Sequence, residues 1–396
     1  MARIGIFGGS FNPPHLGHIL AVREFHNKLD LDRVLLVPAA VPPHKQLSDG
    51  SADAQQRLEM IRLAAEDLPY AQVLDLELRR EGKSYTADTV EELRALYPDD
   101  EIFLLMGTDM FLSFSAWHQP ERIAREVTLA VAHRSADNAS QLLNCAQQLE
   151  ESLRARTILV ENEFLPHSST AVRAMLAFGC AEEYLDARVL NYIRRHGLYQ
   201  SGRDLRALPF EELKSASLRL HKPGRVNHVI GCSETAEQLA LQWGADPVAA
   251  KRAGILHDVT KALNAEEQLH LCAKYDIVLN HFEQRNPKLL HAKTGAAVAA
   301  AVFGESPEVV EAICWHTTGH ADMTVLQKIL YLADYMEPNR DFEGVEKLRH
   351  LARTDLDAAM ICGLEMSMEH VNTQGNEIDP NSLAALRFLQ ERNDTT

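Results

Sequence analysis

The sequence contains no long apolar segment of the kind found in membrane-spanning and exported proteins. Its longest apolar run, residues 296–303, is too short to cross a bilayer. The first residues, Met-Ala-Arg-Ile, lack the apolar region of a signal peptide. We therefore expect a cytoplasmic protein with no membrane partner.

Cysteine is scarce, and its spacing excludes two classes of site. The chain has 6 cysteines, which lie far apart and form no C-x-x-C pair. This spacing fits neither a disulfide framework nor a zinc site built from thiolates. We expect reduced packing residues at all of these positions: Cys145, Cys180, Cys232, Cys272, Cys314 and Cys362.

Positive charge is also in deficit. The chain has 40 lysines and arginines against 56 acidic residues, which gives a formal net charge of −16. A protein that grips nucleic acid through its phosphates needs the opposite balance, so we expect no nucleic-acid partner. Its 396 residues, 46% of them hydrophobic, exceed what one core needs and predict two globular domains. The composition leaves the oligomeric state open.

The spacing of apolar residues changes near residue 200. In the first part, short β-branched or leucine-rich runs alternate with amphipathic helices, which predicts an α/β domain with a Rossmann-like parallel sheet. The later spacing is helical almost throughout and predicts an all-α bundle. We place the first domain at residues 1–199, a linker at 200–208 and the helical domain at 209–396. The predicted strands are Ile4–Phe7, Val34–Pro38, Val73–Leu78, Ile102–Met106, Leu129–Ala132 and Ile158–Val160.

A glycine-rich turn follows the first predicted strand and leads into a helix. Glycines let backbone N–H groups approach a polyphosphate, and a helix N-terminus favours negative charge. His15 and His18 are three residues apart and therefore share one helical face. The alternative is a simple capping turn with two surface histidines. The turn has the sequence Gly8-Gly9-Ser10-Phe11-Asn12-Pro13-Pro14-His15-Leu16-Gly17-His18.

This string resembles the signature of the nucleotidyltransferase superfamily, and its surroundings resemble the bacterial nicotinate mononucleotide adenylyltransferases. The resemblance covers residues 1–199. It implies an enzyme that transfers AMP from ATP to nicotinate mononucleotide, with Mg²⁺ bound to the ATP. A second element of that family is a Ser/Thr-rich turn that opens a helix and carries an arginine, and residues Ser168–Arg173 match it.

The resemblance implies two groups of binding residues. For each of them the alternative is a helix cap, a turn or a core residue. Trp117 is expected to stack on the pyridine ring, a contact that suits an aromatic face. The ATP-binding residues would be Gly8, Gly9, Ser10, Phe11, His15, His18, Gly107, Asp109, Ser168, Ser169 and Arg173. The nicotinate mononucleotide-binding residues would be Lys45, Tyr85, Thr86, Trp117 and Arg134.

The implied transfer needs few acid or base groups. The phosphate of nicotinate mononucleotide attacks the α-phosphorus of ATP and expels pyrophosphate, so alignment and neutralisation of growing charge dominate catalysis. His15, His18 and Arg173 are the expected catalytic residues, and no covalent enzyme intermediate is expected. Another phosphate acceptor, such as phosphopantetheine or glycerol phosphate, is an alternative because the histidine motif is shared by these transferases.

The helical half carries histidines and acids that recur at about the spacing of successive helices in a bundle. Several helices could therefore bring them to one point. Imidazole and carboxylate together suit first-row metals, and an aspartate can bridge two ions. A lone buried histidine is usually a core residue, but this set and order favour a metal site. The set is His228, His257, Asp258, His291, His316 and Asp334.

Five blocks of this half resemble the HD superfamily of metal-dependent phosphohydrolases. The closest likeness is to its YqeK-like branch, whose members resemble symmetrical diadenosine tetraphosphate hydrolases. The resemblance therefore implies a bifunctional enzyme whose second activity splits diadenosine tetraphosphate into two ADP. The blocks are Arg225–His228, His257–Lys261, Leu290–Gly295, Ile313–Gly319 and Tyr331–Arg340.

The same resemblance implies two first-row transition metal ions, which we expect to be iron. Lys261 is expected to take part in catalysis, and Lys261 and Arg340 are expected to bind phosphates, although each could be a solvated surface charge. A helical domain that acts on another nucleotide, or that senses nucleotides without catalysis, is the alternative. By analogy His228, His257, Asp258 and Asp334 would hold one ion, while His291 and His316 would hold the other across a bridging Asp258.

Overall fold

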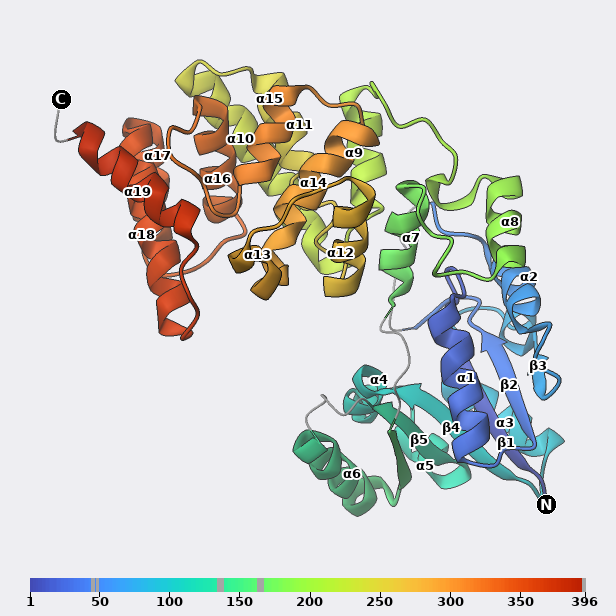
Figure 1. Ribbon diagram of the computed structural model, residues 1–396. Helices are drawn as coiled ribbons and strands as arrows, with labels where there is room; N and C mark the ends of the chain where they lie inside the picture. The colour runs from blue at the N-terminus through green and yellow to red at the C-terminus, as the bar shows by residue number, and fades with distance from the viewer. Residues whose placement is uncertain (44–46, 48–49, 134–138, 162–166, 394–396) are drawn as a thin grey trace. The chain divides into compact units, whose positions relative to one another are not determined.

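The computed structural model describes residues 1–396 except 44–46, 48–49, 134–138, 162–166 and 394–396. The chain forms two compact units, Met1–Gly202 and Arg203–Thr396, and the division falls inside the expected linker (Figure 1). Among the described residues, no helix combines the length and apolar character that a membrane span requires.

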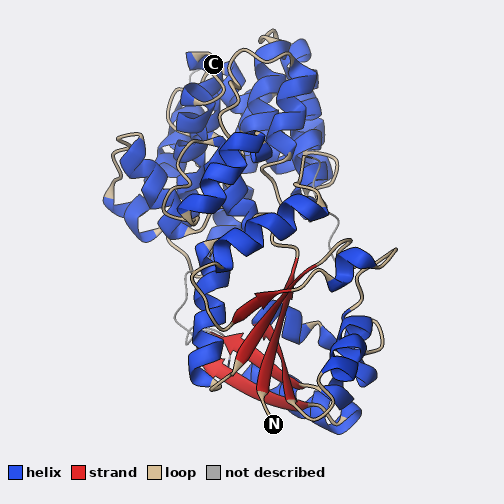
Figure 2. Ribbon diagram, turned by 90° about the vertical axis from the view of Figure 1, so that its right-hand side faces the viewer, coloured by secondary structure: helices blue, strands red, loops and turns tan. Residues whose placement is uncertain are grey.

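The first unit is built on a six-stranded sheet in which every neighbouring pair of strands is parallel (Figure 2). The strand order is β3-β2-β1-β4-β5-β6, so the direction of winding reverses between β1 and β4. In sheets of this kind, ligands bind at the carboxyl ends of the strands beside that reversal. The strands are β1 Arg3–Gly9, β2 Arg33–Pro38, β3 Ala71–Val73, β4 Glu101–Gly107, β5 Thr128–His133 and β6 Arg156–Glu161.

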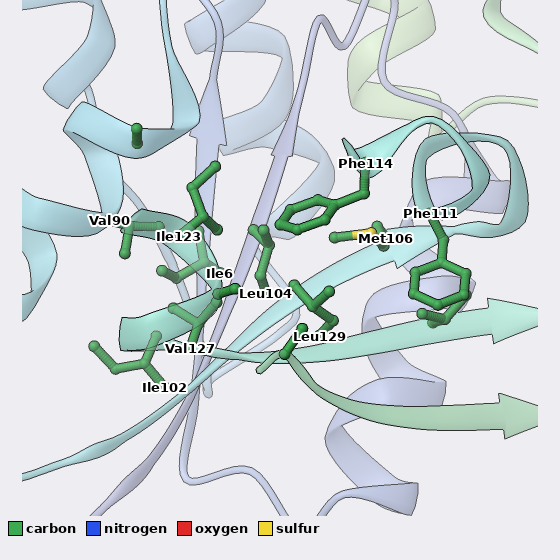
Figure 3. Packing of buried hydrophobic residues seen from close by; sticks show 14 of the residues in the cluster. Ile6, Val90, Ile102, Leu104, Met106, Phe111, Phe114, Ile123, Val127 and Leu129 are labelled. Carbon is green, nitrogen blue, oxygen red and sulfur yellow. The ribbon is translucent and has the colours of Figure 1, made fainter. Parts of the chain in front are cut away.

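Helices cover the sheet and bury apolar side chains from its strands, as a parallel sheet requires. In one buried cluster, Ile6, Leu104 and Leu129 from the strands pack with Val90 and Ile123 from the helices (Figure 3). The helices are α1 Leu16–Lys28, α2 Ala54–Ala65, α3 Thr86–Leu96, α4 Thr108–Leu112, α5 Pro120–Glu126, α6 Ala139–Leu153, α7 Ser169–Ala177 and α8 Ala187–His196. Three short 3-10 helices are η1 Leu76–Arg79, η2 Phe114–Ala116 and η3 Leu198–Gln200. This arrangement confirms the predicted α/β class.

The third strand differs from its predicted position. We expected a strand over Val73–Leu78, but β3 ends at Val73 and η1 follows it. The last hydrogen bond on this side runs from the Leu74 N–H to the Leu36 carbonyl, at 2.9 Å. The next donor on the same edge of β2 would be Pro38, which has no N–H. The ladder therefore stops where the sequence pattern alone would continue it.

The described residues of the second unit form helices and no strand, which confirms the predicted all-α class. Helix α10 lies among several of its neighbours and packs closely on α11 (Figure 1). The helices are α9 Phe210–Leu218, α10 Val226–Trp243, α11 Pro247–Leu256, α12 Ala265–Lys274, α13 His281–Arg285, α14 Leu290–Ala301, α15 Pro307–Trp315, α16 Val325–Met336, α17 Val345–Thr354, α18 Leu356–Thr373 and α19 Pro380–Asn393. Two short 3-10 helices are η4 Pro223–Arg225 and η5 Pro287–Leu289.

Gly254 sets the distance between α10 and α11. A methyl group at this position would lie 2.5 Å from the Cα and 2.9 Å from the N of Ser233, which are backbone atoms and cannot rotate away. We expect Gly254→Ala to lower the free energy of unfolding of the second unit by about 1–3 kcal/mol, measured by chemical denaturation. Gly224→Ala is the control, because a methyl group at Gly224 would have no neighbouring atom within 4 Å. Equal effects of the two substitutions would contradict this packing.

Candidate functional site

The glycine-rich turn places two histidines at the start of α1. β1 ends at Gly9, and His15 caps the helix that begins at Leu16. The two imidazole rings lie 3.7 Å apart between centroids. The ring Nδ1 of His18 accepts a hydrogen bond from the His15 N–H at 3.1 Å. The turn therefore holds both rings in fixed positions beside the helix N-terminus.

A cavity of about 250 Å³ lies at the reversal point of the sheet. Its walls come from β1, α1, β4, β5 and the residues that begin α7. It brings together five of the predicted ATP-binding residues: His15, His18, Gly107, Ser168 and Ser169. The remaining walls are mostly apolar and include Phe7, Ala21, Phe25, Met106 and Ala132. Two segments that are far apart in the sequence, the histidine turn and the serine turn, therefore face one space.

The N-termini of two helices reach this cavity. His15 caps α1 and Ser168 caps α7, and both residues line the cavity. The Ser168 hydroxyl accepts a hydrogen bond from the Ala171 N–H at 3.1 Å. Helix N-termini carry unpaired N–H groups and a partial positive charge, so a phosphate chain would be stabilised here.

His15 is buried, with 6% of its surface exposed. Burial, and then the nearby His18 and His167, hold the pKa of His15 well below its ordinary value of 6.5. An imidazole in this setting is neutral at pH 7 and gains a proton only beside a strongly negative group. A polyphosphate is such a group.

Arg173 lies behind the turn and does not line the cavity. Its guanidinium donates to the Asn12 carbonyl at 2.8 Å and to the Thr170 hydroxyl at 3.3 Å. The sequence predicts Arg173 as an ATP-binding and catalytic residue, whereas in the structure its guanidinium contacts the backbone of the turn. Asp109, which follows Gly107, lies exposed in α4.

The remaining residues predicted to bind ATP form the turn itself. Phe11 is buried and has a positive φ of 45°. Its ring lies 5.2 Å from the ring of His18 between centroids. A methyl group at Gly9 would come within 3.2 Å of the Phe11 ring, so the small residue gives the ring its place. Gly8 and Gly9 are the last residues of β1, opposite Val37 and Pro38 of β2, and Ser10 follows them.

Some of the residues predicted to bind nicotinate mononucleotide lie near one another. The ring of Tyr85 packs against that of His118 at an angle of 30°, with ring centroids 4.1 Å apart, and His118 directly follows Trp117. Trp117 is partly buried against Phe114 at 5.3 Å. Thr86 is the first residue of α3. Lys45 and Arg134 lie outside the described residues.

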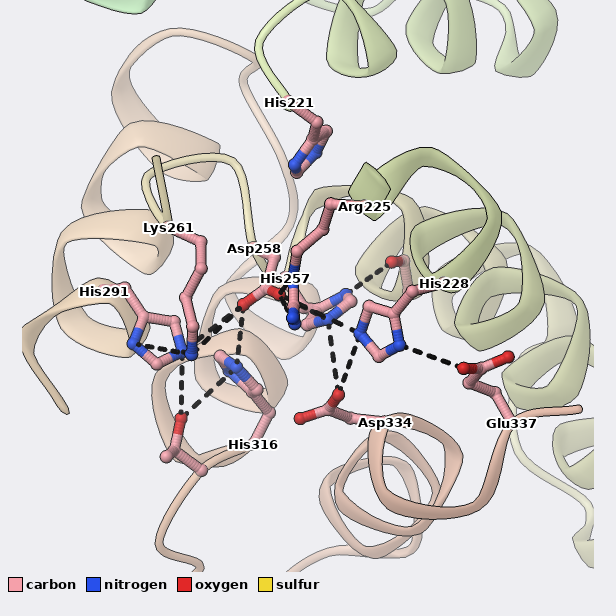
Figure 4. A network of polar contacts seen from close by, with 12 residues as sticks. His221, Arg225, His228, His257, Asp258, Lys261, His291, His316, Asp334 and Glu337 are labelled. Carbon is pink, nitrogen blue, oxygen red and sulfur yellow. Dashed lines mark hydrogen bonds and ion pairs between the residues drawn. The ribbon is translucent and has the colours of Figure 1, made fainter. Parts of the chain in front are cut away.

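A second cluster forms where several helices of the other unit meet (Figure 4). His228 lies in the first turn of α10 and His291 in the first turn of α14. His257 and His316 are the C-cap residues of α11 and α15. Asp258 follows His257, and Asp334 lies near the end of α16. The structure therefore brings all six of the predicted metal-binding residues to one centre.

The contacts in this cluster are short. Asp258 Oδ1 lies 3.3 Å from His291 Nε2 and 3.7 Å from His316 Nε2. Asp258 Oδ2 lies 3.4 Å from His257 Nε2 and 3.9 Å from His228 Nε2. Asp334 Oδ1 lies 3.1 Å from His228 Nε2 and 3.7 Å from His257 Nε2. Asp258 thus has histidines on both of its oxygens, as a bridging carboxylate needs.

Each histidine of the cluster is oriented through Nδ1. The Nδ1 atoms of His257, His291 and His316 contact main-chain carbonyls three residues earlier in the chain, at 2.7, 2.7 and 2.6 Å. Nδ1 of His228 contacts a carboxylate oxygen of Glu337 at 3.1 Å. These carbonyls and this carboxylate can only accept, so Nδ1 carries the proton and the Nε2 lone pair faces the centre.

Three buried atoms of the centre lack a hydrogen-bond partner among the described residues: His228 Nε2, His257 Nε2 and Asp258 Oδ1. Buried polar atoms normally find partners, and these three belong to groups that ligate metals. Two sets have ligand atoms that all lie within 4.8 Å of one another: His228, His257 and Asp334, and His257, Asp258 and His316. The donor set therefore fits a metal ion, and His257 belongs to both sets.

Positive side chains surround the two carboxylates. Arg225 Nε donates to Asp258 Oδ2 at 2.7 Å, and Arg340 Nη2 donates to Asp334 Oδ1 at 2.9 Å. Lys261 Nζ lies 2.8 Å from His291 Nε2. Burial lowers the pKa of Lys261, and burial together with Lys261 lowers that of His291 to about 3.

Sequence reasoning missed four residues that contact the predicted sites. Arg225 and Glu337 stand inside motif blocks, but their types alone gave no role. The Thr317 hydroxyl lies 3.4 Å from His291 Nε2 and 3.3 Å from His316 Nε2. Arg57 contacts the glycine-rich turn at the Ser10 carbonyl, 2.7 Å away, and nothing in its sequence surroundings indicates this.

Glu337 offers a direct test of the metal centre. It is 1% exposed, and its Oε2 accepts from the Asn339 N–H at 2.7 Å while Oε1 contacts His228. Replacing Glu337 by Gln removes the negative charge that supports His228 as a ligand. We expect Glu337→Gln to weaken binding of Mn²⁺ by about 10–100-fold, measured by competition with a chelator.

Glu283→Gln is the matched control. Glu283 is also buried but pairs with Lys293, outside the cluster. Its substitution should leave the affinity for Mn²⁺ unchanged. An unaltered affinity in a folded Glu337→Gln protein would show that His228 does not depend on this carboxylate.

Comparison with known proteins gives a family match in each of the two units. The cytidylyltransferase-like family model matches residues 6–175, and the HD domain model matches residues 225–339. A probable nicotinate-nucleotide adenylyltransferase of Carboxydothermus hydrogenoformans is 37% identical over 200 residues, which cover 50% of this chain and 98% of that protein. Another, from Thermus thermophilus, is 41% identical over 202 residues and is covered over 100% of its length, for 50% of this chain.

A solved structure resembles the other half. It is a predicted HD superfamily hydrolase involved in NAD metabolism from Clostridium acetobutylicum, 32% identical, with a TM-score of 0.46, covering 47% of this chain and 98% of that one. The family matches therefore fall on the same two stretches as the two clusters. Through its N-terminal half the chain belongs to the nicotinate-nucleotide adenylyltransferase family, and its C-terminal half contains an HD domain.

Proposed function

We propose that residues 1–199 transfer the adenylyl group of ATP to nicotinate mononucleotide, releasing pyrophosphate and nicotinate adenine dinucleotide. Family membership supports the reaction. The observation that carries the proposal is the single cavity that His15, His18, Ser168 and Ser169 line together. Two helix N-termini and two imidazoles converge there, as binding of a triphosphate requires.

The proposed chemistry needs positioning more than proton transfer. An oxygen of the nicotinate mononucleotide phosphate forms the new bond to the α-phosphorus, and the bond to the β,γ-pyrophosphate breaks in line with it. His18 would donate to the α-phosphate as its charge shifts, and His15 would hold the phosphate chain. Bound Mg²⁺ would supply neutralisation of the β- and γ-oxygens. Arg173 would act through the turn that it holds.

His18→Ala tests the transferase. The wild-type chain should release pyrophosphate from ATP and nicotinate mononucleotide, but far more slowly with nicotinamide mononucleotide or phosphopantetheine. Loss of the imidazole should lower kcat by about 10²–10³-fold, because it removes one donor to the reacting phosphate.

His196→Ala is the control for this test, because His196 is an exposed residue of the last turn of α8. Its kcat should equal that of the wild-type chain. Faster pyrophosphate release with phosphopantetheine than with nicotinate mononucleotide would contradict the proposed acceptor.

We further propose that residues 209–396 hydrolyse diadenosine tetraphosphate to two ADP. The second centre supports this, because imidazoles and carboxylates converge on buried atoms that lack partners. Two first-row ions, expected to be iron, would supply activation of a water and stabilisation of the developing phosphoryl charge. His228, His257, Asp258 and Asp334 would hold one ion, and His291 and His316 the other.

The positive side chains around this centre favour a substrate with several phosphates. Lys261 and Arg340 are more exposed than the ligands, with 38% and 35% of their side chains accessible, and they contact the ligands directly. They would bind phosphate oxygens of a substrate at this centre. Arg225 has the same relation to Asp258 and is a third such group.

Asp258→Asn tests the hydrolase. It removes the charge that both halves of the centre share, so the protein should lose both bound metal and hydrolysis of diadenosine tetraphosphate by at least about 10²-fold. Metal content is measured by elemental analysis and products by chromatography. The sole product should be ADP.

Asp276→Asn is the control for this substitution, because Asp276 follows α12 and belongs to neither metal set. A wild-type chain that binds metal but hydrolyses no nucleotide would contradict catalysis and favour a sensor. AMP and ATP as products would contradict symmetrical cleavage.

A further inference from the structure

Arg57 is a buried side chain that touches three segments of the first unit. It belongs to α2 and is 1% exposed. Its Nη1 donates to the Ser10 carbonyl at 2.7 Å and to the Ala39 carbonyl at 2.6 Å. Its Nη2 donates to the Ala40 carbonyl at 3.0 Å, and its Nε reaches the Ala52 carbonyl at 3.3 Å. One guanidinium thus contacts three segments: the glycine-rich turn Gly8–His18, which we call the phosphate turn, the segment after β2, and the start of α2.

The charge of Arg57 has no ion-pair partner among the described residues, and neither has that of Arg173. Both guanidiniums are buried and donate hydrogen bonds to main-chain carbonyls of the turn. Arg57 donates to Ser10, and Arg173 donates to Asn12. A buried charge that only neutral carbonyls solvate is costly. A bound anion nearby would offset that cost.

The contacts of Arg57 also orient the backbone. In a trans peptide the C=O and N–H point in opposite directions, so a Ser10 carbonyl turned to Arg57 turns the Phe11 N–H away from it. The Ala39–Ala40 peptide follows the same rule. Its carbonyl faces Arg57, and its N–H donates to the Ser84 hydroxyl at 3.0 Å.

Arg57 therefore links the two substrate sides of the predicted site. The phosphate turn at Ser10 belongs to the ATP side. Ala40 and Val41 belong to the acceptor side, because their N–H groups donate to the hydroxyl of Ser84, which precedes Tyr85 and Thr86. Loss of the guanidinium would free these segments from one another.

We infer that Arg57 is a positioning residue of the transferase, which fixes the phosphate turn relative to the acceptor-side segment and lends the site a buried positive charge. This inference rests on the proposed function. It predicts that substitution of Arg57 lowers kcat, because in-line transfer tolerates little misplacement, and that it weakens stabilisation by ATP.

Two variants separate geometry from charge. Arg57→Met removes both, while Arg57→Lys keeps a charge but cannot reach four carbonyls with one ammonium group. We expect kcat to fall by about 10²-fold in Arg57→Met and by about 10-fold or more in Arg57→Lys. The ATP-induced rise in unfolding temperature should shrink in Arg57→Met and persist in Arg57→Lys.

Arg62→Met is the matched control on the same helix, because Arg62 is half exposed and forms an ion pair with Glu59. It should keep the wild-type kcat and ATP response. Folding of each variant is checked by circular dichroism, and kcat is referred to the folded fraction. Wild-type kcat in folded Arg57→Lys and Arg57→Met would overturn the inference.

Failure of the proposed function would look different. In that case the wild-type chain itself would transfer no adenylyl group to nicotinate mononucleotide. The role of Arg57 would then be decided by the unfolding temperature with ATP. An unchanged ATP response in Arg57→Met would overturn the inference, and a reduced response would support it.

Discussion

Buried charge that the chain neutralises only in part is the constraint common to both units. In the first unit, Arg57 and Arg173 are buried and donate to carbonyls of the phosphate turn. Neither forms an ion pair with a carboxylate among the residues that the structure describes. In the second unit, His228, His257 and Asp258 each have a buried polar atom with no hydrogen-bond partner among the described residues. Because such groups destabilise a fold unless a partner completes them, a ligand of opposite charge would stabilise each cluster, an anion in the first unit and cations in the second.

Ordinary local structure supplies the positions of these groups. Helix ends carry most of them: His15 and Ser168 cap helices at the cavity, while His257 and His316 stand one residue past the ends of their helices. A histidine at a helix C-cap can contact the carbonyl three residues earlier through Nδ1. Its Nε2 then faces the cluster of metal-binding residues. Close packing at Gly254 then brings α11 against α10, and with it His257 toward His228.

The sequence predicts the fold class and much of both clusters, because periodicity and motif order are local signals. The six candidate metal ligands could be chosen by type and order, although their distances could not. The end of β3 was missed because it depends on an absent N–H at Pro38 in a neighbouring strand. The contact of Arg173 with the turn was missed for a related reason: an arginine in a motif does not reveal whether it faces a ligand or a carbonyl.

Arg57 could not be found from the sequence at all. Its partners are main-chain carbonyls at Ser10, Ala39 and Ala40. Every residue has a main-chain carbonyl, so residue type does not indicate which carbonyls accept a hydrogen bond. Glu337 was hidden differently. It stands in a motif block, but only the structure shows that its carboxylate meets His228.

Calorimetry of the full chain tests the central claim most directly, because each ligand should complete one unit. ATP with Mg²⁺ should raise the unfolding temperature of the transition that belongs to the first unit, and Mn²⁺ alone should raise that of the second. Transitions are assigned with His18→Ala and Asp258→Asn proteins, in which the corresponding shift should disappear. If neither ligand moves its transition in the wild-type chain, the partly neutralised clusters are structural and the account is contradicted.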